Sequence, residues 1–270
     1  VLLAPFATAP ATIDPATIAE MRTRAIALIR DQIRPRQEQF VAFLKDEYLP
    51  KARASLAVID MPGGEDWYEY QARHHTTTAQ TPDEIHDIGL AEVARIRGLM
   101  DGVMAETGFT GTFAEFLAFL RTDPQFYATS RQQLLEKASE IAKRSDDRLP
   151  GLFGTLPRLT YGVRPVPEDQ EEGYTTGRYF PGSPQLGLAG GYMINTSKLD
   201  QRPLYELPAL TLHEAVPGHH LQIALQQEAA DQPYFRRQAN VTAFTEGWGL
   251  YSEFLGEEME DGWEGCLSVP

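Results

Sequence analysis

The stretch LTLHEAVPGHHLQI, residues 210 to 223, carries three histidines and one glutamate whose spacing could support chemistry. Zinc hydrolases need about three protein ligands, an open position for water and a carboxylate that takes the proton of that water. His213 and Glu214 match the first half of an HExxH helix, in which the glutamate beside the first histidine reaches the water. These residues indicate metal-dependent hydrolysis, with Glu214 as the general base.

Pro217 stands where the HExxH pattern has its second histidine, and proline cannot bind a metal ion. In an unbroken helix that rises about 1.5 Å per residue, His213 and His220 share a face but lie about 10 Å apart, too far for one ion. A bulge or loosened turn at residues 216 to 218 would bring either His219 or His220 beside His213. The residues alone leave this choice open.

A third ligand is expected from a following helix, where TAFTEGWGLYSE offers Glu246 and Glu253 at i and i+7 on one face. Glu246 follows the histidines at a distance that lets the first helix end and an antiparallel helix return. Gly247 and Gly249 lie close to it and permit two helices to approach. Glu253 is a candidate hydrogen-bond acceptor for a ligand histidine.

Composition limits the class of protein. The 270 residues include 42% hydrophobic residues and predict a globular protein, and a net charge of -14 argues against a nucleic-acid or anionic-membrane partner. No apolar run approaches the ~20 residues of a membrane span. One cysteine, Cys266, excludes an internal disulfide. The opening VLLAPFATAPA has no basic segment, so no signal peptide is evident; a soluble protein is expected, with compartment and oligomeric state open.

The first part of the chain, residues 1 to 150, is expected to form helical hairpins. Asp14 before Pro15 predicts the start of a helix, and a second helix is expected after Pro35. Thr81 before Pro82 predicts the start of a long helix through Met104. Two further helices, over 113–124 and 129–150, are each expected to be closed by a proline.

Residues 151 to 260 are expected to hold the catalytic region. Residues 151–203 are richer in Gly, Pro, Tyr and Thr than the preceding part. Here YTTGRYFPGSP predicts a loop, and GGYMINTS, residues 190 to 197, predicts a short strand. Helical periodicity then returns around the histidines and around Glu246. The fold class is therefore mainly α, with a small β-sheet before the metal-binding helix.

Four blocks, TPDEIHDIGLAEVARIRGLM, GGYMINTSKL, HEAVPGHHLQ and FTEGWGLYSE, resemble recurring blocks of the bacterial DUF885 family, grouped with zincin-type metallopeptidases. The resemblance implies a helical, gluzincin-like fold that binds zinc and cleaves peptide substrates. It implies His213, one of His219 and His220, and Glu246 as zinc ligands, and Glu214 as the base. The TE(x6)E pattern is also similar to HE(x6)E of the thermostable carboxypeptidase family, and this similarity favours His220.

The resemblance also implies substrate contacts. Related zincins place a short edge strand before the metal helix, where it pairs with the substrate backbone, and GGYMINTS occupies that position. Tyr192, Asn195 and Tyr251 are therefore candidates for contacts to substrate or to the oxyanion, with Tyr192 and Tyr251 assigned as catalytic residues.

Two features depart from the family pattern. Members of the family are usually longer, so an alternative interpretation is a catalytically incomplete fragment that acts as a binding or structural module. Residues 261 to 270 form a tail in which EGCLSVP resembles the cysteine-containing motif of peptide deformylases. We interpret this tail as an appended end; a deformylase-like metal hydrolase that uses Cys266 is the other alternative.

Overall fold

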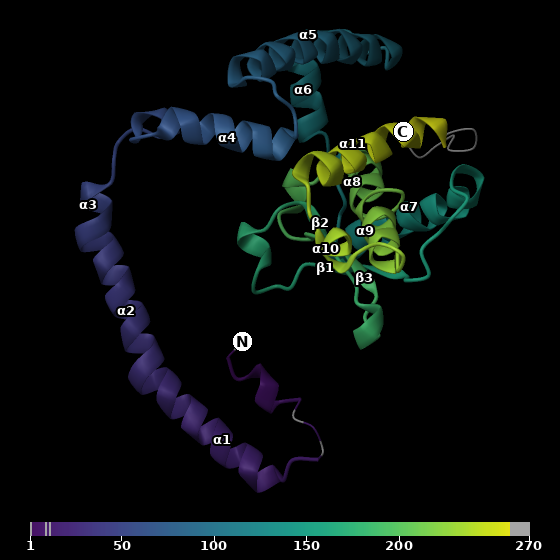
Figure 1. Ribbon diagram of the computed structural model, residues 1–270. Coiled ribbons are helices and arrows are strands. Elements are labelled where there is room, and N and C mark those ends of the chain that lie inside the picture. Colours follow the sequence, from purple (N-terminus) through teal and green to yellow (C-terminus); the bar gives the residue numbers. More distant parts are fainter. Residues whose placement is uncertain (1, 9, 11, 260–270) are drawn as a thin grey trace. The chain divides into compact units, whose positions relative to one another are not determined.

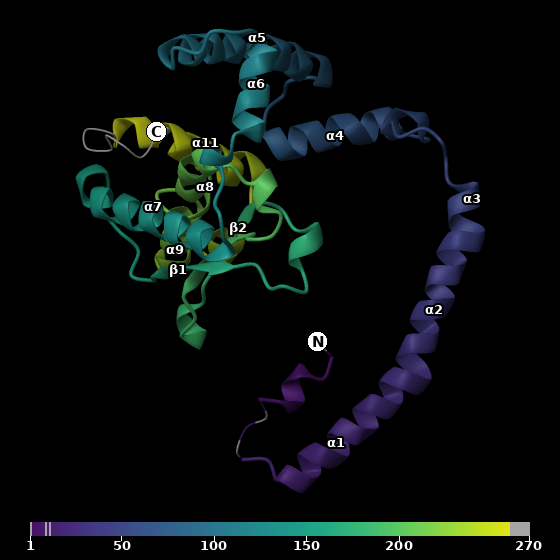
Figure 2. The same cartoon turned by 180° about the vertical axis from the view of Figure 1, so that it is seen from behind.

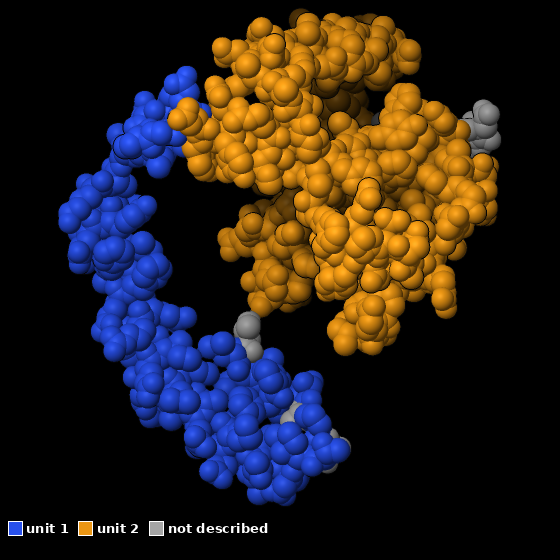
Figure 3. Space-filling view, in the orientation of Figure 1, with its two compact units in different colours: residues 1–65 blue, residues 66–270 orange. Residues whose placement is uncertain are grey.

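The structure, a computed structural model, describes residues 2–8, 10 and 12–259. The chain divides into two compact units, residues 1–65 and residues 66–270, which Figure 3 colours separately. The regions expected from the sequence, 1–150 and 151–260, have a different boundary. They separate a helical region from the region that contains the described strands, which all fall between residues 161 and 194. All the candidate ligands that the structure describes lie in the second unit.

The first unit is dominated by a nearly continuous helical run (Figure 1). Its segments are α1 (Pro15–Leu28), a π-turn (Ile29–Ile33), α2 (Arg34–Phe43), a second π-turn (Leu44–Tyr48) and α3 (Leu49–Lys51). The expected cap is confirmed, because the Asp14 carboxylate accepts a hydrogen bond from the Thr17 N–H at 3.1 Å. The helix does not restart after Pro35: this residue lies in the first turn of α2, directly after the first π-turn, where its missing N–H is tolerated.

Between α3 and the sheet the described chain forms α4 (Gly64–Thr76), α5 (Pro82–Glu106), α6 (Phe113–Thr122) and α7 (Arg131–Leu152). The expected start of α5 is confirmed by a capping box between Thr81 and Glu84. The expected end of α7 before Pro150 is wrong. Pro150 lies within the last turn of α7, and the helix continues to Leu152.

The sheet has three strands, β1 (Tyr161–Pro165), β2 (Gly177–Phe180) and β3 (Gly190–Ile194), in the order β1-β3-β2. β3 runs parallel to β1 and antiparallel to β2. The strand expected in GGYMINTS is confirmed, but its expected place at an edge is wrong, because β3 is paired on both sides. The edge strand that contacts α8 is β2, and it forms within YTTGRYFPGSP, which the sequence predicts to be a loop.

Four helices follow the sheet: α8 (Leu207–Glu214), α9 (His219–Glu228), α10 (Tyr234–Gln238) and α11 (Thr242–Glu258). The main core lies between α7, α8 and the sheet; it includes Leu134, Ile141, Tyr192, Ile194 and Leu207. Figures 1 and 2 both show α11 alongside α8. The expected class, mainly α with a small sheet, is confirmed. None of the described helices has the length and apolarity needed to cross a membrane.

Candidate functional site

The helix that carries His213 is interrupted at the Pro-Gly pair. α8 ends at Glu214, and Ala215 leaves the helical region with φ -98° and ψ -107°. The Val216–Pro217 peptide bond is cis, and α9 begins at His219. The Gly218 N–H donates to the Leu212 carbonyl oxygen at 2.9 Å, which closes a wide turn. The expected distortion at residues 216 to 218 is confirmed.

Gly218 and Trp248 hold this turn in place. A Cβ atom on Gly218 would lie 1.9 Å from the His213 carbonyl oxygen and 2.4 Å from the Leu212 carbonyl oxygen, so only glycine fits the close approach. The Trp248 indole N–H donates to the Pro217 carbonyl oxygen at 2.8 Å. This bond ties the turn to α11, the helix that carries Glu246.

The turn brings His219, rather than His220, beside His213. The ring centroids of His213 and His219 are 4.6 Å apart, with the rings nearly perpendicular. Glu246 Oε2 lies 3.4 Å from His213 Nε2 and 3.7 Å from His219 Nε2. Donor atoms of the three residues all lie within 4.8 Å of one another, so one cation could contact all three. We refer to His213, His219 and Glu246 as the histidine cluster.

The preference for His220 over His219 is corrected by the structure. His220 is 2% exposed, and its ring packs against Tyr161 at a centroid distance of 4.6 Å. Its Nε2 lies 3.0 Å from the Leu159 carbonyl oxygen, which can only accept, so Nε2 carries the proton. Its Nδ1 then accepts from the Tyr179 hydroxyl at 2.9 Å. Both ring nitrogens are thus bound to protein groups, and neither is free for a metal.

His213 is oriented by Glu253, the residue that the sequence marks as an acceptor. Glu253 Oε1 lies 2.7 Å from His213 Nδ1, so the proton of a neutral ring belongs on Nδ1 and the lone pair of Nε2 faces Glu246. The approach depends on Gly249, since a Cβ atom there would lie 2.6 Å from His213 Nε2. Gly247 has no such role, because nothing lies within 4 Å of a Cβ atom at that position.

The surroundings of His219 act on its protonation. Burial lowers the pKa of His219, the neighbouring His213 lowers it further, and Glu246 acts in the opposite direction. The neutral imidazole is therefore favoured. Its Nδ1 is buried and has no hydrogen-bond partner among the described residues.

Glu214 lies next to the histidine cluster in sequence and is buried. Burial raises the pKa of Glu214, and the hydrogen bond that its Oε2 accepts from the Tyr179 N–H, at 2.7 Å, opposes this rise. Tyr179 thus contacts Glu214 through its backbone and His220 through its hydroxyl. The sequence pattern does not single out Tyr179, because YTTGRYFPGSP predicts a loop where β2 forms. The two neighbouring aromatic residues, Tyr179 and Phe180, are the local feature that favours a strand there.

Tyr192 and Asn195 do not line the site, which corrects their expected substrate roles. Tyr192 is fully buried in the central strand, with its hydroxyl 3.3 Å from Thr211 Oγ1. Asn195 is also fully buried, and its amide donates to the Glu171 carbonyl oxygen at 2.8 Å. Because both residues are buried, neither side chain is accessible to a substrate. Their hydrogen bonds instead connect the end of β3 and its central residue to neighbouring segments.

Tyr251 and Cys266 complete the residues singled out from the sequence. Tyr251 is 48% exposed on α11 and contacts the rings of Trp248 and Phe254. The structure does not bring Tyr251 into contact with the histidine cluster, so its catalytic role stays a prediction. Cys266 and the tail 261–270 lie outside the described residues.

The chain is similar to a known protein family and to a protein of known structure. The family described as "Bacterial protein of unknown function (DUF885)" matches residues 2–264. The crystal structure described as that of "the putative lipoprotein from Colwellia psychrerythraea" is similar to the chain, with a TM-score of 0.88 and 30% sequence identity. The similarity covers 96% of this chain and 45% of that chain, so the chain spans less than half of that relative. No curated protein sequence matches it.

Proposed function

The chain belongs to the DUF885 family of bacterial proteins of unknown function, and we propose that it is a zinc-dependent hydrolase of the zincin type that cleaves peptide bonds. The observation that carries the proposal is the approach of His213, His219 and Glu246 to one another. The buried Glu214 is close enough to His213 and Glu246 for both to act on its pKa. The relative of known structure is more than twice as long as this chain. That the chain by itself has this activity is therefore also part of the proposal.

The donor set of the histidine cluster fits zinc. Two imidazole nitrogens and one carboxylate are the ligands of a common class of catalytic zinc site, which leaves a further position open. The carboxylate of Glu253 on His213 Nδ1 is the outer partner that ligand histidines usually have. His213, His219 and Glu246 would hold the ion.

The residues around the ion have separate tasks in peptide cleavage. Zinc, when bound, supplies a positive charge that polarises the substrate carbonyl group and makes water more acidic. Glu214 takes the proton from the attacking water and passes it to the amine that leaves. The Tyr179 N–H fixes the Glu214 carboxylate, and the raised pKa that burial gives Glu214 favours proton uptake.

Metal content is the first test. The purified chain, exposed to zinc and then dialysed, is expected to retain about one zinc ion by elemental analysis. His219→Ala and Glu246→Ala are expected to lose it, whereas His86→Ala, which removes an exposed histidine of α5, is expected to keep it. Absence of zinc from the wild-type chain would overturn the proposal.

Hydrolysis is the second test. A set of internally quenched and carboxyl-terminal peptide substrates is expected to be cleaved by the zinc-loaded chain and not by His219→Ala. Zinc retained without cleavage would contradict the hydrolase and leave a metal-binding module. The relative's description as a lipoprotein supports an exported location, which fractionation of the source bacterium checks.

A further inference from the structure

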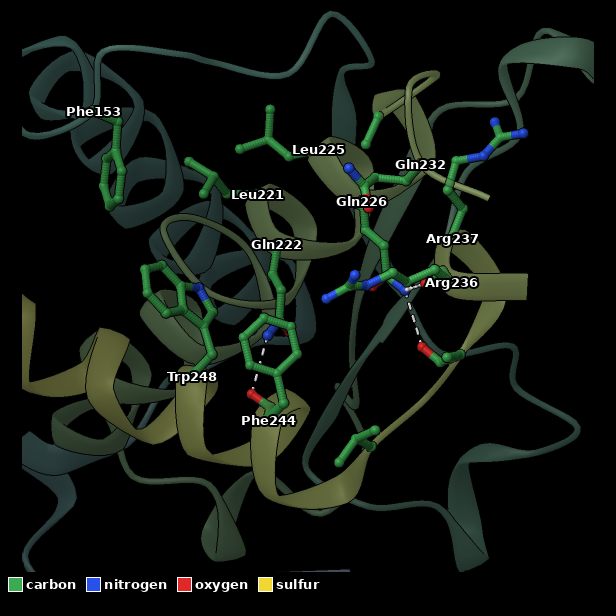
Figure 4. A pocket seen from close by; sticks show the side chains of 13 residues that line it. Phe153, Leu221, Gln222, Leu225, Gln226, Gln232, Arg236, Arg237, Phe244 and Trp248 are labelled. Carbon is green, nitrogen blue, oxygen red and sulfur yellow. Dashed lines mark hydrogen bonds between the residues drawn. The ribbon is translucent and has the colours of Figure 1, made fainter. Parts of the chain in front are cut away.

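The second unit, residues 66–270, also contains an apolar cavity of about 930 Å³ between α9, α10, α11 and the end of α7 (Figure 4). Its apolar wall is formed by Phe153, Leu221, Leu225, Val241, Phe244 and Trp248. A volume of this size lies within the usual range for small-ligand sites, which combine an apolar lining with a few fixed polar groups. None of the three residues of the histidine cluster lines it.

Gln222 gives the cavity a fixed hydrogen-bond acceptor. Gln222 is 8% exposed, and its Nε2 donates to the Phe244 carbonyl oxygen at 3.0 Å. Figure 4 draws this bond as a dashed line. Because a carbonyl oxygen can only accept, this bond sets the orientation of the amide and leaves Oε1 as the other atom. Oε1 is buried and has no partner among the described residues. A ligand that fills the cavity therefore satisfies Gln222 best if it carries a hydrogen-bond donor, such as an amide N–H.

Arg236 and Arg237 give the cavity a positive end. Both line it, and no carboxylate among the described residues pairs with either guanidinium group. Figure 4 shows both side chains on the α10 side of the cavity, opposite Phe153, Leu221 and Trp248. In a chain with a net charge of -14, two arginines without acidic partners beside an apolar wall favour an anionic group of a ligand.

We propose that this cavity binds the carboxyl-terminal residue of a peptide whose last side chain is large and apolar. The side chain packs against the apolar wall, the amide N–H of the residue donates to Gln222 Oε1, and the terminal carboxylate pairs with Arg236 and Arg237. A fatty acid could contact the apolar wall and the arginines, but its ionised form has no hydrogen-bond donor for Gln222 Oε1.

The proposal goes beyond the hydrolase, because binding in this cavity requires neither a metal ion nor cleavage. The two sites share helices, however: α9 carries His219 and Gln222, and α11 carries Glu246 and Phe244. Measurements on metal-free protein separate the two proposals. A failure of peptide binding leaves the zinc content unchanged, and a failure of zinc binding leaves the cavity intact.

Calorimetry with metal-free protein and N-acetyl-Leu-Phe is the test. The free acid is expected to bind saturably, and the same peptide with a carboxyl-terminal amide is expected to bind at least about tenfold more weakly. The double variant Arg236→Gln/Arg237→Gln is expected to lose that difference. Arg24→Gln, which removes an exposed arginine of α1, is expected to behave like the wild-type chain. Equal melting temperatures show that the variants are folded.

Three results would overturn the proposal. The first is equal affinity for the acid and the amide, because the guanidinium groups would then play no part. The second is binding of decanoate as tight as binding of the peptide, which would make the cavity a fatty-acid site. The third is the absence of saturable binding of the acid at millimolar concentration.

Discussion

At the scale of single residues, the candidate centre depends on which ring nitrogen each histidine presents to Glu246. Glu253 settles this for His213, since its carboxylate occupies Nδ1 and leaves Nε2 for the cluster. His220 shows the opposite outcome, because Leu159 and Tyr179 occupy both of its nitrogens. His213 and His220 of one motif thus differ in their hydrogen-bond partners, and only His213 keeps a ring nitrogen that faces Glu246.

The first prediction concerns Glu253. Replacing Glu253 with Gln removes the negative charge beside His213 Nδ1 while keeping an acceptor, so zinc affinity is expected to fall about 10- to 100-fold. Competition with a chromophoric chelator measures the affinity. Glu257→Gln, an exposed change on the same helix, is expected to have no effect. Unchanged affinity in Glu253→Gln would show that Glu253 does not support a ligand.

The second prediction concerns Glu214. Glu214→Gln keeps an oxygen that accepts the Tyr179 N–H but removes the proton acceptor, so the rate of peptide hydrolysis is expected to fall by about 10² to 10⁴. Zinc content is expected to stay at the wild-type level. The measurement is the turnover rate of the variant beside its elemental analysis. A rate close to that of the wild-type chain would exclude Glu214 as the base.

At the scale of elements, the site depends on how closely α11 approaches α8. A Cβ atom on Gly256 would lie 2.5 Å from Leu212 Cδ1, and one on Gly249 would lie 2.6 Å from the His213 ring. Ser252, between them on the same face, is fully buried. Small residues at this spacing let α11 place Glu246 and Glu253 on either side of His213.

The third prediction compares two glycines of α11. Gly249→Ala forces a shift of the His213 ring or of the helix, so it is expected to lower the free energy of unfolding by about 1–3 kcal/mol and to weaken zinc binding. Gly247→Ala meets no atom within 4 Å and is expected to raise the free energy of unfolding, by up to about 1 kcal/mol. Urea denaturation measures both. Similar effects of the two changes would contradict the close packing at Gly249.

At the scale of the whole molecule, the histidine cluster joins parts of the chain that are distant in sequence. α8, α9 and α11 each supply one of its residues, and the β2 edge fixes Glu214 through Tyr179. An unfolded chain does not hold these groups together. A bound ion therefore stabilises the folded unit that carries them, residues 66–270.

The fourth prediction follows from this linkage. Zinc at about 1,000 times its dissociation constant is expected to stabilise the folded chain by about 4 kcal/mol. For a unit of this size, each kcal/mol is expected to raise the melting temperature by about 2–4 °C. Chelation is expected to reverse the shift. Calorimetric melting curves of His219→Ala are expected to show no zinc dependence, whereas those of His86→Ala should match the wild type. A zinc-dependent shift in His219→Ala would place the ion elsewhere.

Local patterns predicted the local structure well. The caps at Asp14 and Thr81 and the distortion at Pro217 and Gly218 depend on interactions within a few residues. The strand at 190–194 was also visible in the local pattern, although its pairing with β1 and β2 is between distant segments. The errors occur where distant contacts decide the outcome. β2 forms because its backbone pairs with β3, and Tyr192 is buried because α8 covers the central strand.

The sequence by itself determined the residue types of the candidate centre, the interruption of its helix and the return of a glutamate on a later helix. Only the tertiary structure decided that His219 faces His213 and that His220 points away. The physical reason is that successive helical residues differ by about 100° in direction, so the start of α9 selects the histidine. That start is set by Trp248 on Pro217 and by Tyr179 and Leu159 on His220, which are contacts between distant segments.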